Sequence, residues 1–336
     1  MNKTEQGVLH QSKLRHLLIH ILLLLTFCLT QPASAEASAA NTTQQEKHTQ
    51  KHHVFVIYSP DNILHSDIIQ QLSENLKLKR SDIIISEVTP EEEGKTVNSK
   101  TDLIIGIGNA GIKSAHKYYP KTKKLLISTD PNKYKLDKNK NEAILYMSQP
   151  YCRQIRFIKL INNKWKTIGL LDSQKKPIDT KTIQQCAKKY HLDTYIAKTK
   201  TNEDLKIRIK DVLKHSDILL ALPDKNIYNS QSVKNILLTS YRHRIPVIAF
   251  SENFVTAGAL AAISSSTEQI SNSASDLVEQ YFKSGQMFKN SVNYPQAFDI
   301  SINRQVFRAL DLSIPDLDEL KQIVEHLTIN EADKLQ

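Results

Sequence analysis

Short apolar runs alternate with amphipathic stretches along most of this chain after residue 51. Apolar runs without internal alternation suit strands that are covered on both faces, whereas apolar positions three and four residues apart suit helices. Strands that alternate with helices predict a parallel sheet with helices on both faces. The expected strands of this first series are 53–59, 82–88, 102–108 and 124–129, and the expected helices are 63–76 and 113–119.

The same alternation starts again after Pro150. Two lobes built from strand-helix-strand units and joined edge to edge are therefore the simplest architecture, and the predicted fold class is α/β. Beyond the second series the chain continues with an amphipathic helix at 268–285, an extended piece at 297–303, a short helix at 304–312 and a helical tail at 317–335. The elements expected in the second series are helices 152–161, 181–191 and 203–215, and strands 167–172, 194–197, 218–222 and 246–250.

Two expected strands of the second series run straight into polar loops. The run 218–222 leads into Pro223 to Asn226, and the run 246–250 leads into Ser251 to Asn253. In open α/β sheets, ligands bind outside the carboxyl ends of the strands. Polar side chains in these loops are therefore candidates for ligand contacts, and function is sought there first.

Several segments resemble the substrate-binding proteins of ABC importers, in particular the group that includes bacterial tryptophan- and tyrosine-binding proteins. The resemblance covers most of residues 100–316 and implies a type I periplasmic binding fold, with two Rossmann-like lobes joined by a hinge. One segment departs from the family: the Lys- and Asn-rich 132–144 replaces a Gly-rich loop, which bears on the ligand more than on the fold. The segments that carry the resemblance are ALPD (221–224), LLTSYRHRIPVIAFSE (237–252), AGALAAISSS (257–266), TDP (129–131), SQPYCRQIR (148–156) and YPQAFDISINRQVFRALDLSIPD (294–316).

The resembling fold has connecting strands that cross between the lobes, so neither lobe needs to be continuous in sequence. We therefore assign residues 52–148 and 265–292 to the first lobe, and residues 149–264 and 293–336 to the second lobe.

The amino terminus is typical of a secretory signal. Lys13 and Arg15 precede the apolar run 17–30, and the small residues Ala33 to Ala35 form a cleavage pattern. We expect a signal peptide at 1–35, a flexible leader at 36–51 and a periplasmic protein. An uncleaved anchor and lipidation at Cys28 are the less favoured alternatives, the latter because bulky Phe27 precedes the cysteine.

The formal net charge of +10 raises the question of nucleic acid binding. The lysines are scattered along the whole chain and are not interleaved with aromatic residues, so a solvated Lys-rich surface is the better interpretation and no nucleic acid partner is expected. Cys152 and Cys186 remain after signal cleavage, and an exported protein permits them to pair. The sequence leaves open whether they form a disulfide.

Residues 106–111 match the G-x-G-x-x-G pattern of dinucleotide-binding proteins, and Asp130 follows about twenty residues later. The pattern lies on the third expected strand, whereas the dinucleotide motif usually opens its domain. An exported protein is also unlikely to use a soluble cofactor that must be recycled, so we interpret the pattern as a tight turn. The same turn can hold a small anion on its backbone amides. Asn109 and Ala110 are therefore candidate ligand contacts.

No nucleophile constellation or metal site stands out in the sequence. His48, His52 and His53 form a local group, but it lies in or beside the flexible leader. Serines 264–266 are interpreted as a strand end followed by a helix cap. We expect no cofactor, no metal and no catalysis.

Nine residues are the candidate ligand contacts, and most have a structural alternative. Asp130 could instead start a turn with the following proline, Asp224 could cap a helix, and Glu252 could favour the start of one. Three tyrosines, Tyr58, Tyr151 and Tyr228, could stack on an aromatic ligand, although packing in the core or rim is the more common role. The candidates are Ser59, Asn109, Ala110, Thr129, Asp130, Gln149, Asp224, Ser251 and Glu252.

These observations predict an exported, monomeric solute-binding protein that closes two lobes around a small organic ligand and presents it to a membrane importer. The resemblance implies an amino acid as ligand. The alternative is a periplasmic sensor or scaffold that keeps the fold with a degenerate site. A nucleotide-dependent enzyme is the third hypothesis, and the export signal argues against it.

Overall fold

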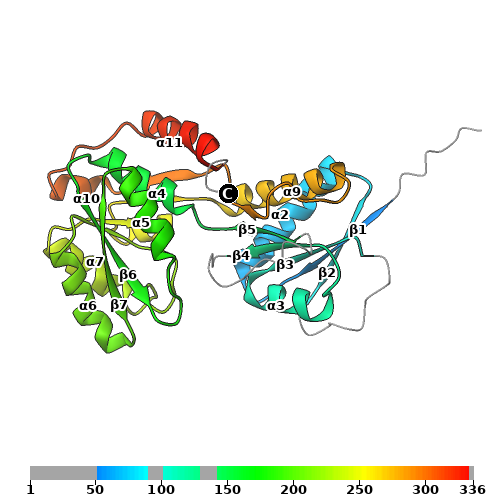
Figure 1. The fold of residues 1–336 in the computed structure, drawn as a ribbon, viewed down its shortest axis with the longest axis horizontal. Helices are drawn as coiled ribbons and strands as arrows, with labels where there is room; N and C mark the ends of the chain where they lie inside the picture. The colour runs from blue at the N-terminus through cyan, green and yellow to red at the C-terminus, as the bar shows by residue number, and fades with distance from the viewer. Residues whose placement is uncertain (1–50, 90–100, 129–141, 333–336) are drawn as a thin grey trace, which may run out of the picture. The chain divides into compact units, whose positions relative to one another are not determined.

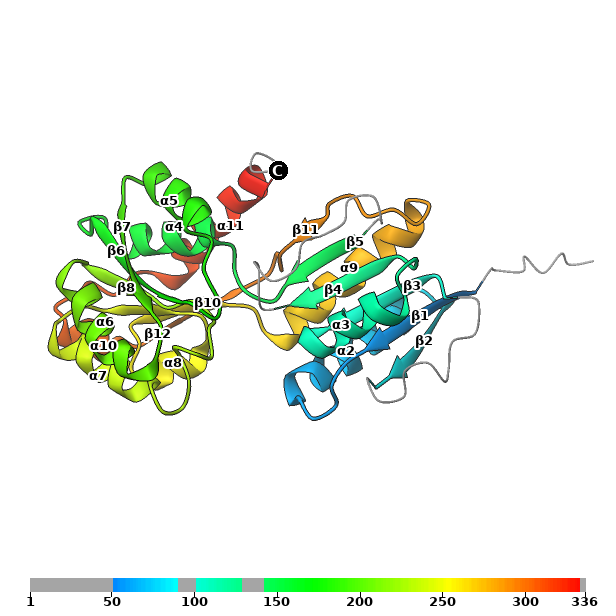
Figure 2. The same ribbon diagram turned by 60° about the horizontal axis from the view of Figure 1, so that its bottom comes forward.

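The computed structural model describes residues 51–89, 101–128 and 142–332, in two six-stranded sheets flanked by helices (Figures 1 and 2). We call each sheet, with the helices packed on it, a lobe. Within these residues no helix combines the length and apolar character that crossing a membrane requires. The expected fold class, two Rossmann-like lobes, is confirmed.

The first sheet has the strand order β11-β5-β4-β3-β1-β2, and all of its neighbouring strands are parallel. Its central strands are apolar on both faces, as a parallel sheet covered on both sides requires. β5 was not expected from the sequence, because we interpreted 132–144 as a loop. The strands are β1 (His52–Ile57), β2 (Ile83–Val88), β3 (Leu103–Ile107), β4 (Lys124–Ser128), β5 (Glu142–Tyr146) and β11 (Val292–Asn293).

The second sheet repeats this arrangement with the order β12-β10-β9-β8-β6-β7. Five of its strands are parallel, and β12 pairs antiparallel with β10. The strands β5-β4-β3-β1-β2 of the first sheet and β10-β9-β8-β6-β7 of the second thus have the same spatial order relative to their order in the chain. The strands are β6 (Thr167–Ser173), β7 (Asp193–Thr199), β8 (Ile218–Leu220), β9 (Val247–Ala249), β10 (Ala261–Ser264) and β12 (Asp299–Ile302).

Helices α2 (Ile63–Lys79) and α9 (Thr267–Lys283) lie side by side on one face of the first sheet, and α3 (Gly108–Tyr118) packs on strands of the same sheet. The Ser271 hydroxyl of α9 donates a hydrogen bond to the Ile68 carbonyl of α2 at 3.0 Å. α9 begins at the serine cap expected from the sequence, because Ser266 and Gln269 form a reciprocal capping box. A helix that follows the five parallel strands of the second sheet in the chain therefore completes the core of the first lobe (Figure 2).

Both faces of the second sheet are covered. The first face carries α4, α5, α10 and α11, and the second carries α6, α7 and α8. A disulfide between Cys152 and Cys186 joins α4 to α5 inside the core of the first face. The helices are α4 (Tyr151–Ile161), α5 (Thr180–Lys189), α6 (Asn202–Lys214), α7 (Val233–Arg242), α8 (Glu252–Thr256), α10 (Arg304–Ala309) and α11 (Leu317–Ala332).

A buried ion pair lies at the amino-terminal edge of the first sheet. Lys124 and Glu142 are in register on β4 and β5, with side chains 0 % and 2 % exposed, and Lys124 Nζ lies 3.3 Å from Glu142 Oε1. His116 Nε2 lies 3.5 Å from Glu142 Oε2. Burial raises the pKa of the Glu142 carboxyl, but the His116 hydrogen bond and the Lys124 charge outweigh it and bring the pKa down to about 2.

Candidate ligand-binding site

Each lobe has a point where two neighbouring parallel strands send the chain to opposite faces of the sheet and in opposite directions along it. In the first lobe it lies between β1, followed by α2, and β3, followed by α3. In the second lobe it lies between β6, followed by α5, and β8, followed by α7. At such a switch point the connections diverge and leave a crevice outside the carboxyl ends of the strands. We call the residues at these two points the switch-point residues.

In the first lobe, Ser59, Asn109 and Ala110 are switch-point residues. Ser59 follows β1, and its carbonyl accepts a hydrogen bond from the Asn62 amide at 3.2 Å. Asn109 and Ala110 are exposed in the first turn of α3. The structure therefore brings these three candidates to the ends of neighbouring strands.

The glycines of the G-x-G-x-x-G pattern serve close packing. A methyl group at Gly111 would lie 2.2 Å from the Ile57 carbonyl oxygen, and one at Gly108 would lie 2.3 Å from His65 Cε1. Gly108 also has a φ of 68°, which favours glycine. The imidazole of His65 thus lies against the backbone at the start of α3, where a dinucleotide fold places the pyrophosphate. This arrangement supports the interpretation of the pattern as a turn.

In the second lobe, Asp224 and Ser173 are switch-point residues. Ser173 ends β6 and donates a hydrogen bond to Asp224 Oδ2, while Asp224 Oδ1 accepts from the backbone amide and the side-chain amide of Asn226 at 2.9 and 2.8 Å. Asp224 is only 7 % exposed. Because a carboxylate oxygen has two lone pairs, Oδ2 keeps one acceptor position in this set of bonds. Asp224 does not cap a helix, since α7 begins only at Val233.

An aromatic group lies beside Asp224. The rings of Phe250 and Phe254 lie 4.6 Å apart, and both approach Tyr228 edge-on at about 6 Å. Tyr228 is 7 % exposed, and burial together with the Asp224 charge raises its pKa. Its hydroxyl makes no hydrogen bond within the part of the chain that the structure describes.

Ser251 and Glu252 lie at the end of β9, the strand next to β8. Ser251 occupies the residue before α8 without a side-chain capping bond, and Glu252 is exposed in the first turn of that helix. Both side chains therefore stand at the same edge of the second sheet as Asp224.

Gln149 lies among the segments that connect the two sheets. Its amide nitrogen donates to Ser265 Oγ at 2.7 Å, and Ser265 Oγ donates to the Ala297 carbonyl at 2.7 Å. The Gln149 amide oxygen accepts from Arg153, whose guanidinium also donates to the Pro295 carbonyl at 3.0 Å. All three connecting segments, at 147–150, 264–266 and 294–298, are thus bonded to one another. Gln149 is 4 % exposed and is committed to these bonds, so its role as a ligand contact stays a prediction.

Arg153 is the buried cation of this group. Its side chain is 6 % exposed and lies 4.8 Å from the centre of the Phe298 ring. Burial lowers the pKa of the guanidinium to about 10, and the charge of Glu325 acts in the opposite direction. The guanidinium stays protonated at neutral pH at this value, so it donates its hydrogen bonds as a cation.

Thr129, Asp130 and His48 fall outside the described residues. Elsewhere, no group of three or more His, Cys, Asp or Glu side chains is placed to hold a metal ion in the described ranges. Sequence reasoning missed Ser173, Arg153 and Ser265, whereas Asn226 belongs to a loop that it did single out. Ser173 had a signal, because it ends an apolar strand as the other candidates do, whereas the Arg153 bonds depend on segments more than a hundred residues apart.

A family model described as ABC transporter substrate binding protein matches residues 92–322. A tyrosine-binding protein of Clostridioides difficile is 25 % identical over 243 residues, which are 68 % of this chain and 68 % of that protein.

Solved structures show the same fold. A ligand-free, open substrate-binding protein with adhesive properties from Clostridium difficile has a TM-score of 0.62 at 16 % identity, covering 79 % of this chain and 96 % of that one. The ABC domain of a Streptococcus pneumoniae protein in complex with L-Trp has a TM-score of 0.56 at 15 % identity, covering 80 % and 98 %. A conserved domain protein from Vibrio cholerae has a TM-score of 0.57 at 18 % identity, covering 81 % and 98 %.

Proposed function

We propose, from the premise that this chain belongs to the family of ABC transporter substrate-binding proteins, that it is the exported solute-binding component of an importer. It binds a small organic ligand with residues of both lobes and performs no catalysis. The observation that carries the proposal is the repeated topology, which places polar candidate residues at the switch point of each lobe.

The ligand is an amino acid. Asn109 and Ala110, exposed in the first turn of α3, suit a carboxylate, because the helix dipole places positive charge at that end. The remaining acceptor position on Asp224 Oδ2 suits one N–H of an ammonium group, and such charge-assisted bonds are strong. The similarity to a tyrosine-binding protein and to a domain solved with L-Trp supports this ligand class.

Binding shifts an equilibrium between open and closed lobes. Contacts from both lobes are satisfied together only in the closed form, so the ligand stabilises that form by its differential affinity. A transport permease then recognises the closed protein. The signal peptide at 1–35 directs the chain to the periplasm, where it acts as a monomer.

The test is ligand-dependent thermal stabilisation of the chain that begins at Glu36, measured against a panel of amino acids, nucleosides and small acids. We expect the melting temperature to rise with the concentration of at least one amino acid, since a ligand that binds only the folded state adds RT ln(1 + [L]/Kd) to its stability.

Asp224→Asn removes the charge but keeps one oxygen for Asn226, and we expect it to weaken binding by about tenfold or more, the scale of one lost charge-assisted bond. Asp172→Asn is the matched control, because Asp172 is equally buried on β6 and its carboxylate accepts from the Ile178 amide. Equal affinities of the Asp224 variant and the native chain would remove Asp224 from the site.

A sensor or scaffold that binds a protein partner is the second candidate function. The buried, largely satisfied state of Asp224 favours it, because a site closed by its own hydrogen bonds need not receive a ligand. A well-folded protein that no compound in a broad panel stabilises would support this candidate.

A further inference from the structure

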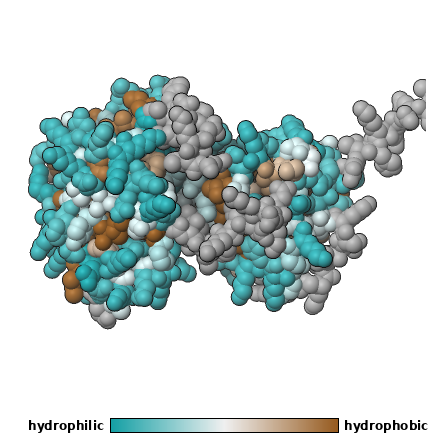
Figure 3. Space-filling model, in the orientation of Figure 1, coloured by the Kyte–Doolittle hydropathy of each residue, from teal (hydrophilic) through white to brown (hydrophobic). Residues whose placement is uncertain are grey.

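The outer face of helices α6 and α7 carries exposed apolar side chains. Ile207 of α6 is 64 % exposed, and Leu238 and Tyr241 of α7 are 42 % and 50 % exposed. The two helices contact each other on the same face of the second sheet, with their inner sides in its core. Exposed apolar side chains that gather on neighbouring elements mark interaction surfaces, whereas single ones are ordinary. In Figure 3 apolar positions stand among hydrophilic ones over these two helices.

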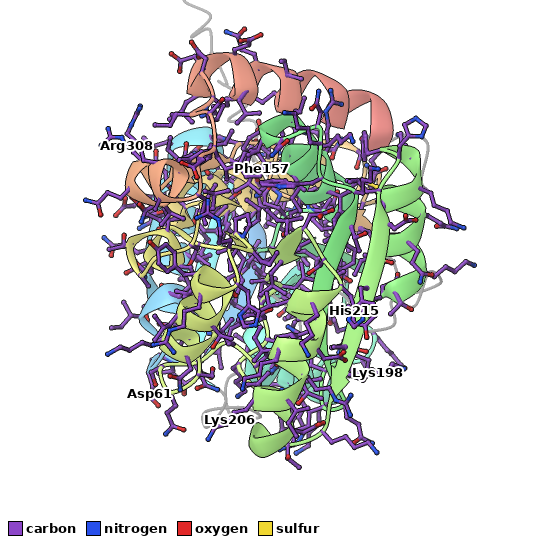
Figure 4. All side chains as sticks on the ribbon, turned by 90° about the vertical axis from the view of Figure 1, so that its left-hand side faces the viewer. Asp61, Phe157, Lys198, Lys206, His215 and Arg308 are labelled. Carbon is purple, nitrogen blue, oxygen red and sulfur yellow. A yellow bond between two sulfur atoms is a disulfide. The ribbon has the colours of Figure 1, made fainter. Side chains whose placement is uncertain are left out.

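The charge of the same face is predominantly basic. Lys206, Lys210 and Lys214 follow one another at four-residue spacing along α6, and all three are exposed. The side chain of Lys206 extends away from the helix (Figure 4). The sequence of α6 also contains three acids, Glu203, Asp204 and Asp211, and Arg208 approaches the last two to 3.1 and 3.9 Å. With four basic and three acidic residues, α6 keeps a net positive charge.

The basic bias extends over α7. No Asp or Glu occurs from Lys225 to Ser251, a stretch that contains the whole helix. Within α7, Lys234 and Arg242 are exposed and flank Leu238 at four-residue spacing on either side. Basic side chains thus flank Leu238 on both sides along α7.

We propose that this outer face of α6 and α7 docks on an anionic phospholipid surface. Helices that lie on membranes place apolar side chains into the headgroup boundary and surround them with lysines and arginines, whose stems lie along the lipid while their charges reach the phosphates. Tyr241 adds a ring with one polar end, which suits the interface. Basic side chains close to an anionic surface add to the attraction one by one, and this face presents five of them: Lys206, Lys210, Lys214, Lys234 and Arg242.

The proposal is independent of the ligand site, because no switch-point residue is part of this face. It assigns to the second lobe a role in holding the protein at the membrane where an importer resides. An acidic protein carries negative charge as an anionic phospholipid surface does. The experiment below therefore distinguishes an acidic protein partner from a lipid surface.

The experiment measures partition of the chain from Glu36 onto vesicles of phosphatidylcholine with about one third phosphatidylglycerol, by co-sedimentation at low and physiological salt. Vesicles of phosphatidylcholine alone serve as the reference. We expect binding to the anionic vesicles that weakens with salt. The triple variant Lys206→Glu, Lys210→Glu, Lys214→Glu is expected to lose about tenfold or more in partition.

The matched control changes Lys164, Lys181 and Lys188 to Glu, which alters the net charge equally on exposed positions away from α6 and α7. A second variant, Ile207→Ser with Leu238→Ser, keeps every charge and is expected to reduce the binding that remains at physiological salt. Equal loss in the control triple, or no loss in the apolar double variant, would overturn docking by this face. Absence of vesicle binding by the native chain, with retention on an acidic protein matrix, would replace lipid by protein as the partner.

Discussion

Gly111 permits a helix to approach a strand more closely than a side chain would allow. Its Cα faces the Ile57 carbonyl, and a methyl group there would lie 2.2 Å from that oxygen. We expect Gly111→Ala to lower the free energy of unfolding by about 1 to 3 kcal/mol, because α3 must move away from β1. Urea denaturation measures the change, with Ala110→Ser at the exposed neighbouring position as control. A Gly111 variant as stable as the control would contradict the packing argument.

Glu142 gives the first lobe a defined response to acid. Its pKa of about 2 in the folded chain lies below the ordinary value of 4.5. A lowered pKa stabilises the fold above pH 4.5, and that stabilisation of about 3 kcal/mol is lost as the pH falls toward 2. We expect Glu142→Gln to be less stable than the native chain at pH 7 and the difference to shrink between pH 4.5 and 2.

Urea denaturation at pH 7, 4 and 3 provides the measurement for Glu142. The exposed Glu74→Gln is the control and should leave the pH profile unchanged. A constant difference between the native and Glu142 variant chains across this range would show that His116 and Lys124 do not depress the pKa of Glu142.

At the scale of elements, the disulfide joins α4, which follows the first connecting segment, to α5. The two cysteines are 34 residues apart in sequence and are 8 % and 2 % exposed. Closing a loop of this size restricts the unfolded chain and contributes about 3 kcal/mol. We expect Cys152→Ala with Cys186→Ala to lose this amount in urea denaturation.

A reducing agent provides the control for the disulfide. It should destabilise the native chain from Glu36 and leave the double variant unaffected, because no other cysteine remains after residue 35. Two free thiols in the folded, unreduced protein would contradict the pairing.

How far the sequence predicts each element depends on the range of the forces that shape it. Apolar runs and cap residues act locally, so most strands and the Ser266 cap of α9 could be predicted. β5 could not, because a Lys- and Asn-rich stretch runs directly into it. Its only signal is the short run Ala143 to Tyr146, which becomes a strand by pairing with β4.

At the scale of the whole molecule, the family and the two-lobe fold follow from segments spread along the chain. The candidate site can be predicted only in part from the sequence, and the reason is physical. Strand ends indicate which residues stand at the carboxyl edge, so Asp224 and Asn109 could be named. The partners that hold them are brought there by strand order, as Ser173 is by the pairing of β6 with β8. The spatial order of strands cannot be predicted from the local pattern of apolar and polar residues.

The placement of α9 on α2 sets an order of folding events as the chain emerges from its amino end. Ile68 and Leu72 of α2 are fully buried in a core that contains Ala274 and Val278 of α9. About two hundred residues must therefore emerge before this apolar surface is covered, whereas the parallel strands of the second lobe are complete earlier. The first lobe begins first and finishes last, so its α2 face is an apolar surface that stays uncovered through most of the emergence of the chain and that a chaperone has reason to hold.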